Sequence, residues 1–159
     1  MMNKKYFMHL LAAVMVAMLS VGFASCSSDN DDNEVPETTT FNVKDLVGTW
    51  GLTHAEGWET WQGQKETFSD DYDPENPKGG DDTMMVITNP SGNTFKIVQY
   101  EWDEFKKDWE EAFSGEAELD ANKLTAYNMT FLSVSATQLV AEVSAGSLGY
   151  TKQTYKRMK

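Results

Sequence analysis

Thr83 to Trp102 reads TMMVITNPSGNTFKIVQYEW, and this stretch decides the fold class. Two short runs rich in Val, Ile, Thr and aromatic residues flank the segment Asn89-Pro90-Ser91-Gly92-Asn93. β-Branched and aromatic side chains suit strands, whereas Asn, Pro, Ser and Gly favour reversals of the chain. The stretch therefore predicts two antiparallel strands joined by a turn.

The same alternation of strand-like runs and turn residues extends outward through residues 41–159. Further turn residues occur at Asp73-Pro74, Asn76-Pro77, Gly79-Gly80, Asp120-Ala121-Asn122 and Ala145-Gly146. The expected strands are Gly48 to Glu56, Glu59 to Phe68, Thr83 to Thr88, Thr94 to Trp102, Trp109 to Leu119, Lys123 to Val134, Gln138 to Val143 and Leu148 to Met158. This regular spacing predicts an all-β fold, a small eight-stranded antiparallel meander that forms a barrel or a sandwich. Closure into a barrel would remove the exposed edges of the strands.

One segment fits two local structures. Apolar residues recur at helical spacing with charged residues between them, at Trp102, Phe105, Trp109, Ala112 and Phe113. A hairpin that turns near Lys106-Lys107-Asp108 explains the same residues, with charged side chains at the turn. The strand-like flanks favour the hairpin, and a short amphipathic helix that caps one end of the barrel stays open as the alternative.

Residues 1–25 have the features of a signal peptide and are set apart from the fold. Lys4 and Lys5 precede a largely apolar run from Phe7 to Phe23, which is slightly short for a helix that spans a membrane. An uncleaved membrane anchor is the alternative. Cys26 favours cleavage, because it is the single cysteine of the chain and follows this run directly. With one cysteine, no internal disulfide can form.

The segment Phe23-Ala24-Ser25-Cys26 resembles the lipobox of bacterial lipoproteins, with Phe23 where that pattern prefers an aliphatic residue. The resemblance implies diacylation of Cys26, cleavage before it, and acylation of the new amino terminus by a fatty acid such as palmitate. Each buried CH₂ contributes about 0.8 kcal/mol, so two or more chains hold a protein at a membrane for long times. We therefore expect a membrane-anchored lipoprotein.

Residues 26–40 predict a disordered acidic tether, because they carry no apolar periodicity. The run Ser27-Ser28-Asp29-Asn30-Asp31-Asp32-Asn33-Glu34 is similar to the acidic stretch of Bacteroidota-type lipoproteins. That similarity implies an anchor in the outer membrane with display on the cell surface, and a periplasm-facing anchor is the alternative.

The mature part of the chain is strongly acidic. Residues 1–25 hold two lysines and no acidic residue, so the formal net charge changes from −12 for the chain to −14 without them. Phosphate groups are repelled by such a charge. We therefore expect no binding to nucleic acid or to anionic lipid headgroups.

Residues 41–159 suffice for one domain and carry a family resemblance. Leu46-Val47-Gly48-Thr49-Trp50 looks like the opening Gly-x-Trp of lipocalin-like barrels, and Ser114 to Leu124, Phe131 to Val140 and Thr154 to Arg157 are similar to later strands of bacterial lipocalin-like lipoproteins. The resemblance implies a barrel in which Arg157 lies across Trp50 and closes one end. It also implies a protein that binds a small apolar or amphipathic ligand without catalysis.

The mature part offers few groups for catalysis. Its one histidine is His54, and Cys26 is assigned to lipidation, so neither a Cys–His pair nor a site of several histidines is available. No Gly-rich phosphate loop occurs. We expect a protein that is not an enzyme and that needs no cofactor.

The acidic loop from Asp70 to Asp82 is the candidate metal site. Its acidic residues Asp71, Asp73, Glu75 and Asp82 have spacings like those of a calcium loop. Asn76 stands where such a loop needs Gly, two prolines intrude, and the final ligand is not Glu. A mobile surface loop without metal is the favoured interpretation.

Four tryptophans are candidates for ligand contact, namely Trp58, Trp61, Trp102 and Trp109. Exposed rings would stack on sugars or contact a protein, although packing in the core is the favoured interpretation for a small domain. The alternative function is an interaction module with a filled barrel that binds glycan or protein through loops and exposed Trp. A cavity open at the end opposite Trp50 would favour the small ligand instead.

Overall fold

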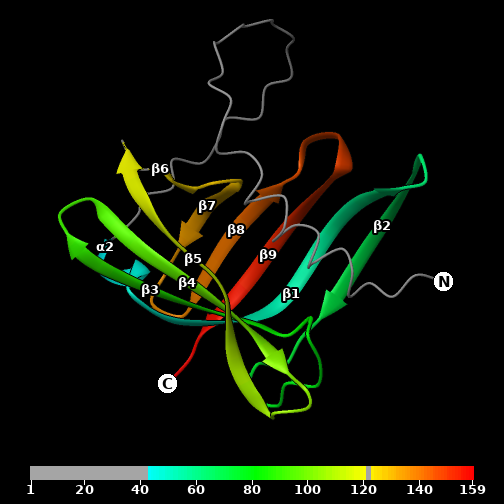
Figure 1. Ribbon diagram of the computed structural model, residues 1–159. Coiled ribbons are helices and arrows are strands. Elements are labelled where there is room, and N and C mark those ends of the chain that lie inside the picture. The colour runs from blue at the N-terminus through cyan, green and yellow to red at the C-terminus, as the bar shows by residue number, and fades with distance from the viewer. Residues whose placement is uncertain (1–42, 121–122) are drawn as a thin grey trace, which may run out of the picture.

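The computed structural model describes residues 43–120 and 123–159. A short helix, α2 (Val43–Leu46), leads into the strands, which are almost all of the structure (Figure 1). The strands are β1 (Gly48–Trp61), β2 (Gln64–Asp71), β3 (Thr83–Ser91), β4 (Thr94–Asp103), β5 (Asp108–Asp120), β6 (Lys123–Ala126), β7 (Met129–Val134), β8 (Gln138–Ser144) and β9 (Gly149–Arg157). A turn of 3-10 helix, η1 (Gly146–Leu148), precedes β9.

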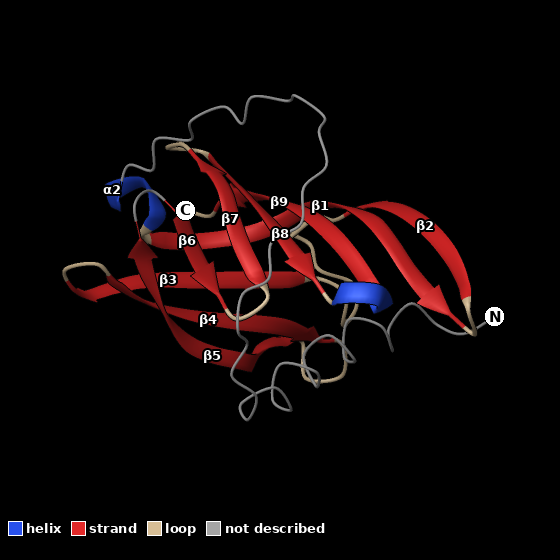
Figure 2. Cartoon of the chain, turned by 90° about the horizontal axis from the view of Figure 1, so that it is seen from above, coloured by secondary structure: helices blue, strands red, loops and turns tan. Residues whose placement is uncertain are grey.

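Eight of these strands close into a barrel. Hydrogen bonding runs from β1 to β3 and then in chain order to β9, and β9 pairs with β1. Every pair is antiparallel. Figure 2 shows β3, β4 and β5 on one side of the barrel and β7, β8 and β9 on the other. The predicted eight-stranded antiparallel barrel is confirmed, and the sandwich is not formed.

β2 is the strand outside the ring. It pairs with the second half of β1, from His54 to Trp61, whereas β3 pairs with the first half, from Gly48 to Gly51. Two strands thus share one edge of β1, and the β1–β2 hairpin projects beyond the barrel (Figure 1).

Two predicted strands have the wrong bounds because each contains a tight turn. The range Glu59 to Phe68 is interrupted at Gln62-Gly63, where φ is 50° and 79°. The range Lys123 to Val134 is divided into β6 and β7 by a turn at Tyr127-Asn128, with φ of 55° at Tyr127. Gln and Tyr rarely adopt positive φ, so these two turns are difficult to predict from the sequence.

Residues 102–113 form the predicted hairpin, and the helical alternative is wrong. β4 ends at Asp103, β5 begins at Asp108, and Trp102 pairs with Trp109. The side chain of Asp103 accepts hydrogen bonds from the backbone N–H groups of Phe105 and Lys106 at 2.8 and 3.0 Å. These bonds fix the turn. The two tryptophan rings pack edge to face on one side of the hairpin, with centroids 5.5 Å apart.

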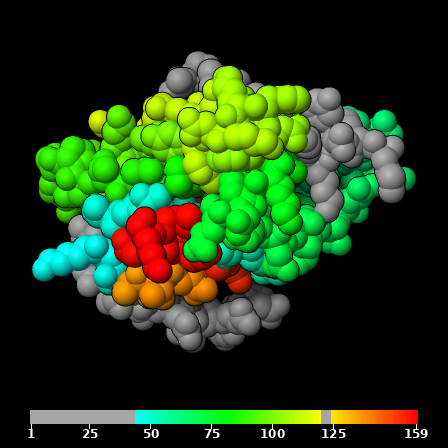
Figure 3. Space-filling model, turned by 90° about the horizontal axis from the view of Figure 1, so that it is seen from below, coloured from blue at the N-terminus to red at the C-terminus, as the bar shows by residue number. Residues whose placement is uncertain are grey.

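The core lies inside the ring and ends at Trp50. Its largest fully buried side chains are Trp50, Tyr155, Phe95, Phe131, Leu46, Leu52, Met85, Ile87, Leu124 and Leu139. The indole N–H of Trp50 donates to the carbonyl of Leu46 at 2.9 Å, and the Arg157 guanidinium lies 4.2 Å over the ring. In Figure 3 the described start of the chain, the β7–β8 turn and the C-terminus gather at this end, in cyan, orange and red.

Candidate functional site

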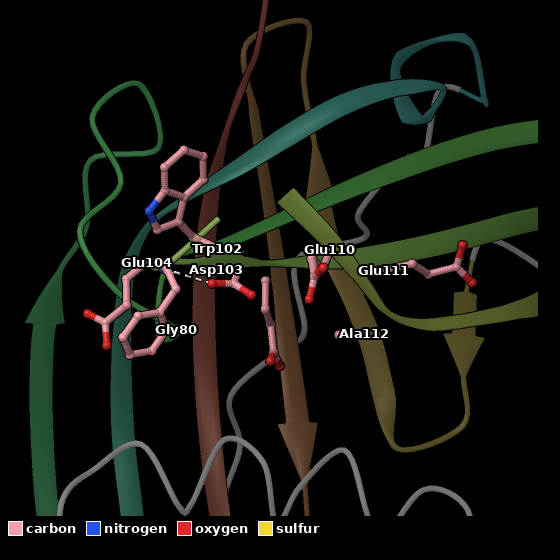
Figure 4. A pocket seen from close by; sticks show the side chains of 9 residues that line it. Gly80, Trp102, Asp103, Glu104, Glu110, Glu111 and Ala112 are labelled. Carbon is pink, nitrogen blue, oxygen red and sulfur yellow. Dashed lines mark hydrogen bonds between the residues drawn. The ribbon is translucent and has the colours of Figure 1, made fainter. Parts of the chain in front are cut away.

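A pocket of about 390 Å³ lies along the half of the β4–β5 hairpin that is next to its turn. This volume falls within the range of about 300–1,000 Å³ that is usual for small-molecule sites. Figure 4 shows its lining residues, which come from the acidic loop, from both strands of the hairpin and from the turn between them: Gly80, Glu101, Trp102, Asp103, Glu104, Phe105, Glu110, Glu111 and Ala112.

The lining is acidic because of the strand register. Glu101 pairs directly with Glu110, and Asp103 is two residues further along β4, so the three carboxylates share one side of the hairpin. In Figure 4 the ring of Trp102 lies on the other side from Glu110. The carboxylates of Glu101 and Glu110 therefore lie close together on this side.

The acidic side of β4 continues the inner side of the barrel. Phe95 and Ile97 are buried in the core, and alternation along the strand places Glu101 and Asp103 on the same side as these residues. Along one strand, the inner side thus changes from apolar within the barrel to acidic beyond it.

Lys106 contacts this acidic side from the turn between the two strands. Its ammonium group hydrogen-bonds to Glu110 and lies 3.6 Å from Asp103. The hydrogen bond to Glu110 raises the pKa of Lys106. Backbone N–H groups of Lys106 and Phe105 lower the pKa of Asp103. These contacts favour the charged form of both Lys106 and Asp103.

Phe105 supplies the apolar part of the pocket. Its side chain is 90% exposed, although the backbone at the turn is held by Asp103. Burying such a ring is worth about 1.5–3 kcal/mol, which the isolated protein does not gain. One exposed ring is common on protein surfaces, and it gains this burial only where a partner covers it.

The four candidate tryptophans do not form one site. Trp58 and Trp61 belong to the β1–β2 hairpin, and Trp102 and Trp109 belong to the β4–β5 hairpin. The ammonium of Lys65 lies 4.2 Å from the centre of the Trp58 ring. Trp61 is 44% exposed, so the interpretation that it packs in the core is wrong. Trp58, Trp102 and Trp109 are half-buried, and of the four Trp102 lines the pocket.

The four carboxylates of the calcium-loop candidate contact separate groups of the protein. Asp71 lies 2.7 Å from Nδ1 of His54, and Glu75 lies 3.0 Å from the ammonium of Lys156. Asp73 accepts from the Asn76 amide at 2.9 Å, which lowers the pKa of Asp73. Asp82 accepts from the backbone N–H groups of Lys78 and Gly79 at 2.7 and 3.0 Å. Across residues 43–120 and 123–159, no group of three or more His, Cys, Asp or Glu is placed to hold a metal.

The pocket residues Glu101, Phe105 and Glu110 were not singled out from the sequence as site residues. The signal that identifies them is an apolar residue at a predicted hairpin turn with acidic residues on both sides. Their common location follows from the strand register, which the spacing of residues alone does not specify.

The predicted lipidation site at Cys26 and the tether to residue 40 lie outside the described residues. In the part of the chain that the structure describes, no helix has the length and apolar character needed to cross a membrane.

Several solved structures are similar to this chain, among them a siderocalin and an amine-binding protein. No family model and no curated protein matches the chain. The siderocalin Ex-FABP, described as acting through dual ligand specificities, is 8% identical, with a TM-score of 0.45 over 72% of this chain and 74% of its own. The amine-binding protein of Rhodnius prolixus, solved with tryptamine, is 14% identical, with a TM-score of 0.49 over 85% of this chain and 72% of its own. At these values neither structure informs the residues or the ligand of this chain, and the fold follows from the strand pairing.

Proposed function

We propose that this chain is a lipid-anchored binding protein without catalysis, which holds a small amphipathic ligand in the pocket of the β4–β5 hairpin. The observation that carries the proposal is the pocket of about 390 Å³, where Phe105 and Ala112 lie beside carboxylates. Apolar surface next to a few placed polar groups is the combination that orients an amphipathic molecule.

The contacts of the carboxylates support binding rather than catalysis. Hydrolysis by a carboxylate pair requires one member that stays protonated near neutral pH. In the pocket, backbone N–H groups lower the pKa of Asp103, and Lys106 pairs with Glu110. The first of these contacts favours the ionised form of Asp103, and an ionised carboxylate cannot donate a proton.

The proposal includes attachment to the outer membrane through lipid on Cys26, with the barrel on the cell surface. The support is the lipobox-like Phe23-Ala24-Ser25-Cys26 and the acidic run that follows. A periplasm-facing barrel is the alternative orientation. Protease treatment of whole cells distinguishes the two, because only a surface barrel is cleaved before the outer membrane is opened.

Native mass spectrometry of protein purified from its own membranes tests the binding function. The expected result is a small molecule that co-purifies with the unaltered protein. Phe105→Ser removes the apolar ring and Ala112→Trp fills the pocket, so both variants should lose the molecule. Trp61→Ser removes an exposed ring from the other hairpin and serves as the matched control. Retention of the molecule by both pocket variants would contradict the proposal.

A second function, binding of glycan or protein through exposed rings, is favoured by one observation. Trp61 is 44% exposed at the end of β1, where an amphipathic ring is free to contact a sugar or a protein surface. A glycan array read with the unaltered protein and with Trp61→Ala tests it. Binding that depends on Trp61 and not on Phe105 would favour this second function.

A further inference from the structure

Strand β2 has an edge that faces away from the barrel (Figure 2). Within residues 43–120 and 123–159, β2 is hydrogen-bonded to β1 and to no other strand, so its second edge has no strand beside it. An edge of this kind is a template on which a further strand can pair. We infer that this edge pairs with the same edge of a second copy of the chain, antiparallel and with the two-fold axis at Thr67.

The turn between β1 and β2 determines which backbone groups of β2 face outward. Trp61 pairs with Gln64 across a two-residue turn, and residues that flank such a turn exchange hydrogen bonds. Because the pattern alternates, Gln64 and every second residue after it face β1. The N–H of Tyr72, which donates to the carbonyl of Thr53 at 2.9 Å, continues this alternation. The residues whose backbone groups face the outer edge are therefore Lys65, Thr67 and Ser69.

The outer edge of β2 lacks the features that commonly prevent pairing with another chain. β2 contains no proline, and its register with β1 is regular from Gln64 to Asp71. A lysine at an edge usually opposes pairing. The ammonium of Lys65, however, lies 4.2 Å from the centre of the Trp58 ring, so this charge is held toward β1. The edge can therefore accept a strand without rearrangement of β2.

The sequence of β2 is complementary to itself in one register. A symmetric pair must place residues with outward-facing backbone groups opposite one another. With the axis at Thr67, the opposed residues are Thr67 with itself, Lys65 with Ser69, Glu66 with Phe68, and Gln64 with Asp70. No two like charges are directly opposed in this arrangement.

Other positions of the axis are less favourable. An axis at Glu66 places that carboxylate opposite its copy, and an axis at Phe68 places Glu66 opposite Asp70. Like charges directly opposite each other destabilise a strand pair. An axis at Ser69 avoids this repulsion but leaves the first three residues of β2 without partners in the second β2. The register centred on Thr67 therefore combines a long ladder with no opposed like charges.

Phe68 adds an apolar contact to the pair. Its side chain is half-buried and is the one aromatic or aliphatic side chain of β2. With the axis at Thr67, the two Phe68 side chains are diagonal neighbours on the same face of the combined sheet. Diagonal neighbours lie about 7–8 Å apart, which aromatic side chains can span. Apolar surface that is exposed in one copy is therefore buried in the pair.

Attachment to one membrane would favour this pairing. The chain has a net charge of −12, which opposes contact between copies. Two copies anchored in the same membrane would meet at a higher effective concentration than in solution, which offsets this repulsion. This contribution rests on the proposed lipid anchor, whereas the free edge and the register do not.

Disulfide cross-linking in isolated membranes tests the pairing. Thr67→Cys places a single free thiol at the axis, because Cys26 is expected to be acylated. Residues opposed in this way have Cα atoms about 5.5 Å apart, which a disulfide can span. Mild oxidation should therefore convert this variant into a covalent dimer on a non-reducing gel. The unaltered protein should stay monomeric under the same treatment.

Ser69→Cys is the matched control for the register. Ser69 is exposed on the same strand and the same face as Thr67. With the axis at Thr67, however, the two copies of residue 69 are four positions apart along the ladder, more than about 13 Å, which no disulfide spans. Ser69→Cys should therefore not cross-link with itself. It should cross-link with Lys65→Cys when both variants are made in the same cells, because these two positions are opposed.

Thr67→Pro tests the pairing without a thiol. The proline removes an N–H that faces outward, so it deletes a bond between the copies and none to β1. Thr67→Ala keeps this N–H and is the control. In sedimentation of the purified lipoprotein in density-matched detergent, the unaltered protein and Thr67→Ala should be dimers. Thr67→Pro should be a monomer with an unchanged far-ultraviolet circular dichroism spectrum.

The outcomes separate this inference from the proposed function. Failure of Thr67→Cys to cross-link, cross-linking of Ser69→Cys with itself, or a dimer that persists in Thr67→Pro would overturn the inference. None of these results bears on the pocket, because its described lining residues include none of β2. Absence of the protein from the membrane fraction would count against the lipid anchor, and sedimentation of the purified protein would then decide the pairing.

Discussion

The guanidinium of Arg157 lies 4.2 Å above the ring of Trp50 and joins three segments of the chain at the closed end of the barrel. Its N–H groups donate to the carbonyl of Ala136 at 2.7 Å, to that of Val47 at 2.8 Å, and to that of Asp45. One side chain thus links β9 to the turn before β8 and to the segment that leads into β1.

Arg157→Ala should therefore lower the free energy of unfolding by about 2–4 kcal/mol, since it removes a cation–π contact and several charge-assisted hydrogen bonds. Urea denaturation followed by tryptophan fluorescence measures the change. Lys156→Ala is the control, because it removes the neighbouring cation, whose exposed pair with Glu75 should contribute less than about 1 kcal/mol. Equal effects of the two substitutions would contradict the closing role of Arg157.

Gly57→Ala should destabilise the barrel, because β1 and β9 approach each other closely at this residue. A Cβ at Gly57 would lie 2.0 Å from the carbonyl oxygen of Tyr150 and 2.9 Å from the Cα of Thr151. Backbone atoms must shift to admit the methyl group, at a cost of about 1–3 kcal/mol. Chemical denaturation measures it against Thr60→Ala on the same strand. A midpoint unchanged from that of the control would show that the two strands are further apart than the structure has them.

Acid should loosen the turn of the β4–β5 hairpin. Hydrogen bonds from the backbone N–H groups of Lys106 and Phe105 hold the pKa of Asp103 below its ordinary value of 3.8. The folded hairpin therefore binds this proton less readily than the unfolded one, so the contribution of Asp103 is present above that ordinary value and is lost as the pH falls through the lowered one. Near-ultraviolet circular dichroism of the packed Trp102 and Trp109 rings, recorded from about pH 6 to pH 2, follows the loss. The Asp103→Asn variant should lose this part of the pH dependence, and a curve identical to that of the unaltered protein would argue against it.

Cys26→Ser should release the protein from membranes, because without the thiol no fatty acid is attached. Fractionation of cells and immunoblotting measure the distribution. A protein that stays in the membrane fraction at the size of the unprocessed chain would instead identify Phe7 to Phe23 as the anchor. Ser25→Ala keeps a small residue before Cys26 and serves as the control that should remain processed and attached.

The strands were the most predictable part of the molecule. Thr83 to Trp102 forms two strands and a turn as expected, because its residues alternate between the core and the surface and its turn residues suit a reversal. The exclusion of β2 from the ring was not predictable in this way. It results from the length of β1, which continues to Trp61 and pairs with β3 over its first residues alone.

The candidate site was less predictable than the fold. Alternation along β4 determines the side that carries Glu101, but which residue of β5 lies opposite depends on a register that shifts between Gln99 and Tyr100. The spacing of residues along one strand does not show where its pairing with the neighbouring strand shifts. The acidic loop, in contrast, was a candidate metal site because of the spacing of its acidic residues. In the structure each of its candidate carboxylates contacts a different group of the protein.

Because β2 and β3 share one edge of β1, the two ends of the barrel differ in stiffness. Four residue pairs join β1 to β3, from Gly48 to Gly51, whereas nine join β1 to β9 on the opposite edge. Beyond Gly51, β1 and β3 form no residue pairs within the described residues. The β1–β2 hairpin and the β4–β5 hairpin can therefore move apart while the end of the barrel at Trp50 keeps its shape. We therefore expect hydrogen exchange to be faster in the two projecting hairpins than in the strands around Trp50.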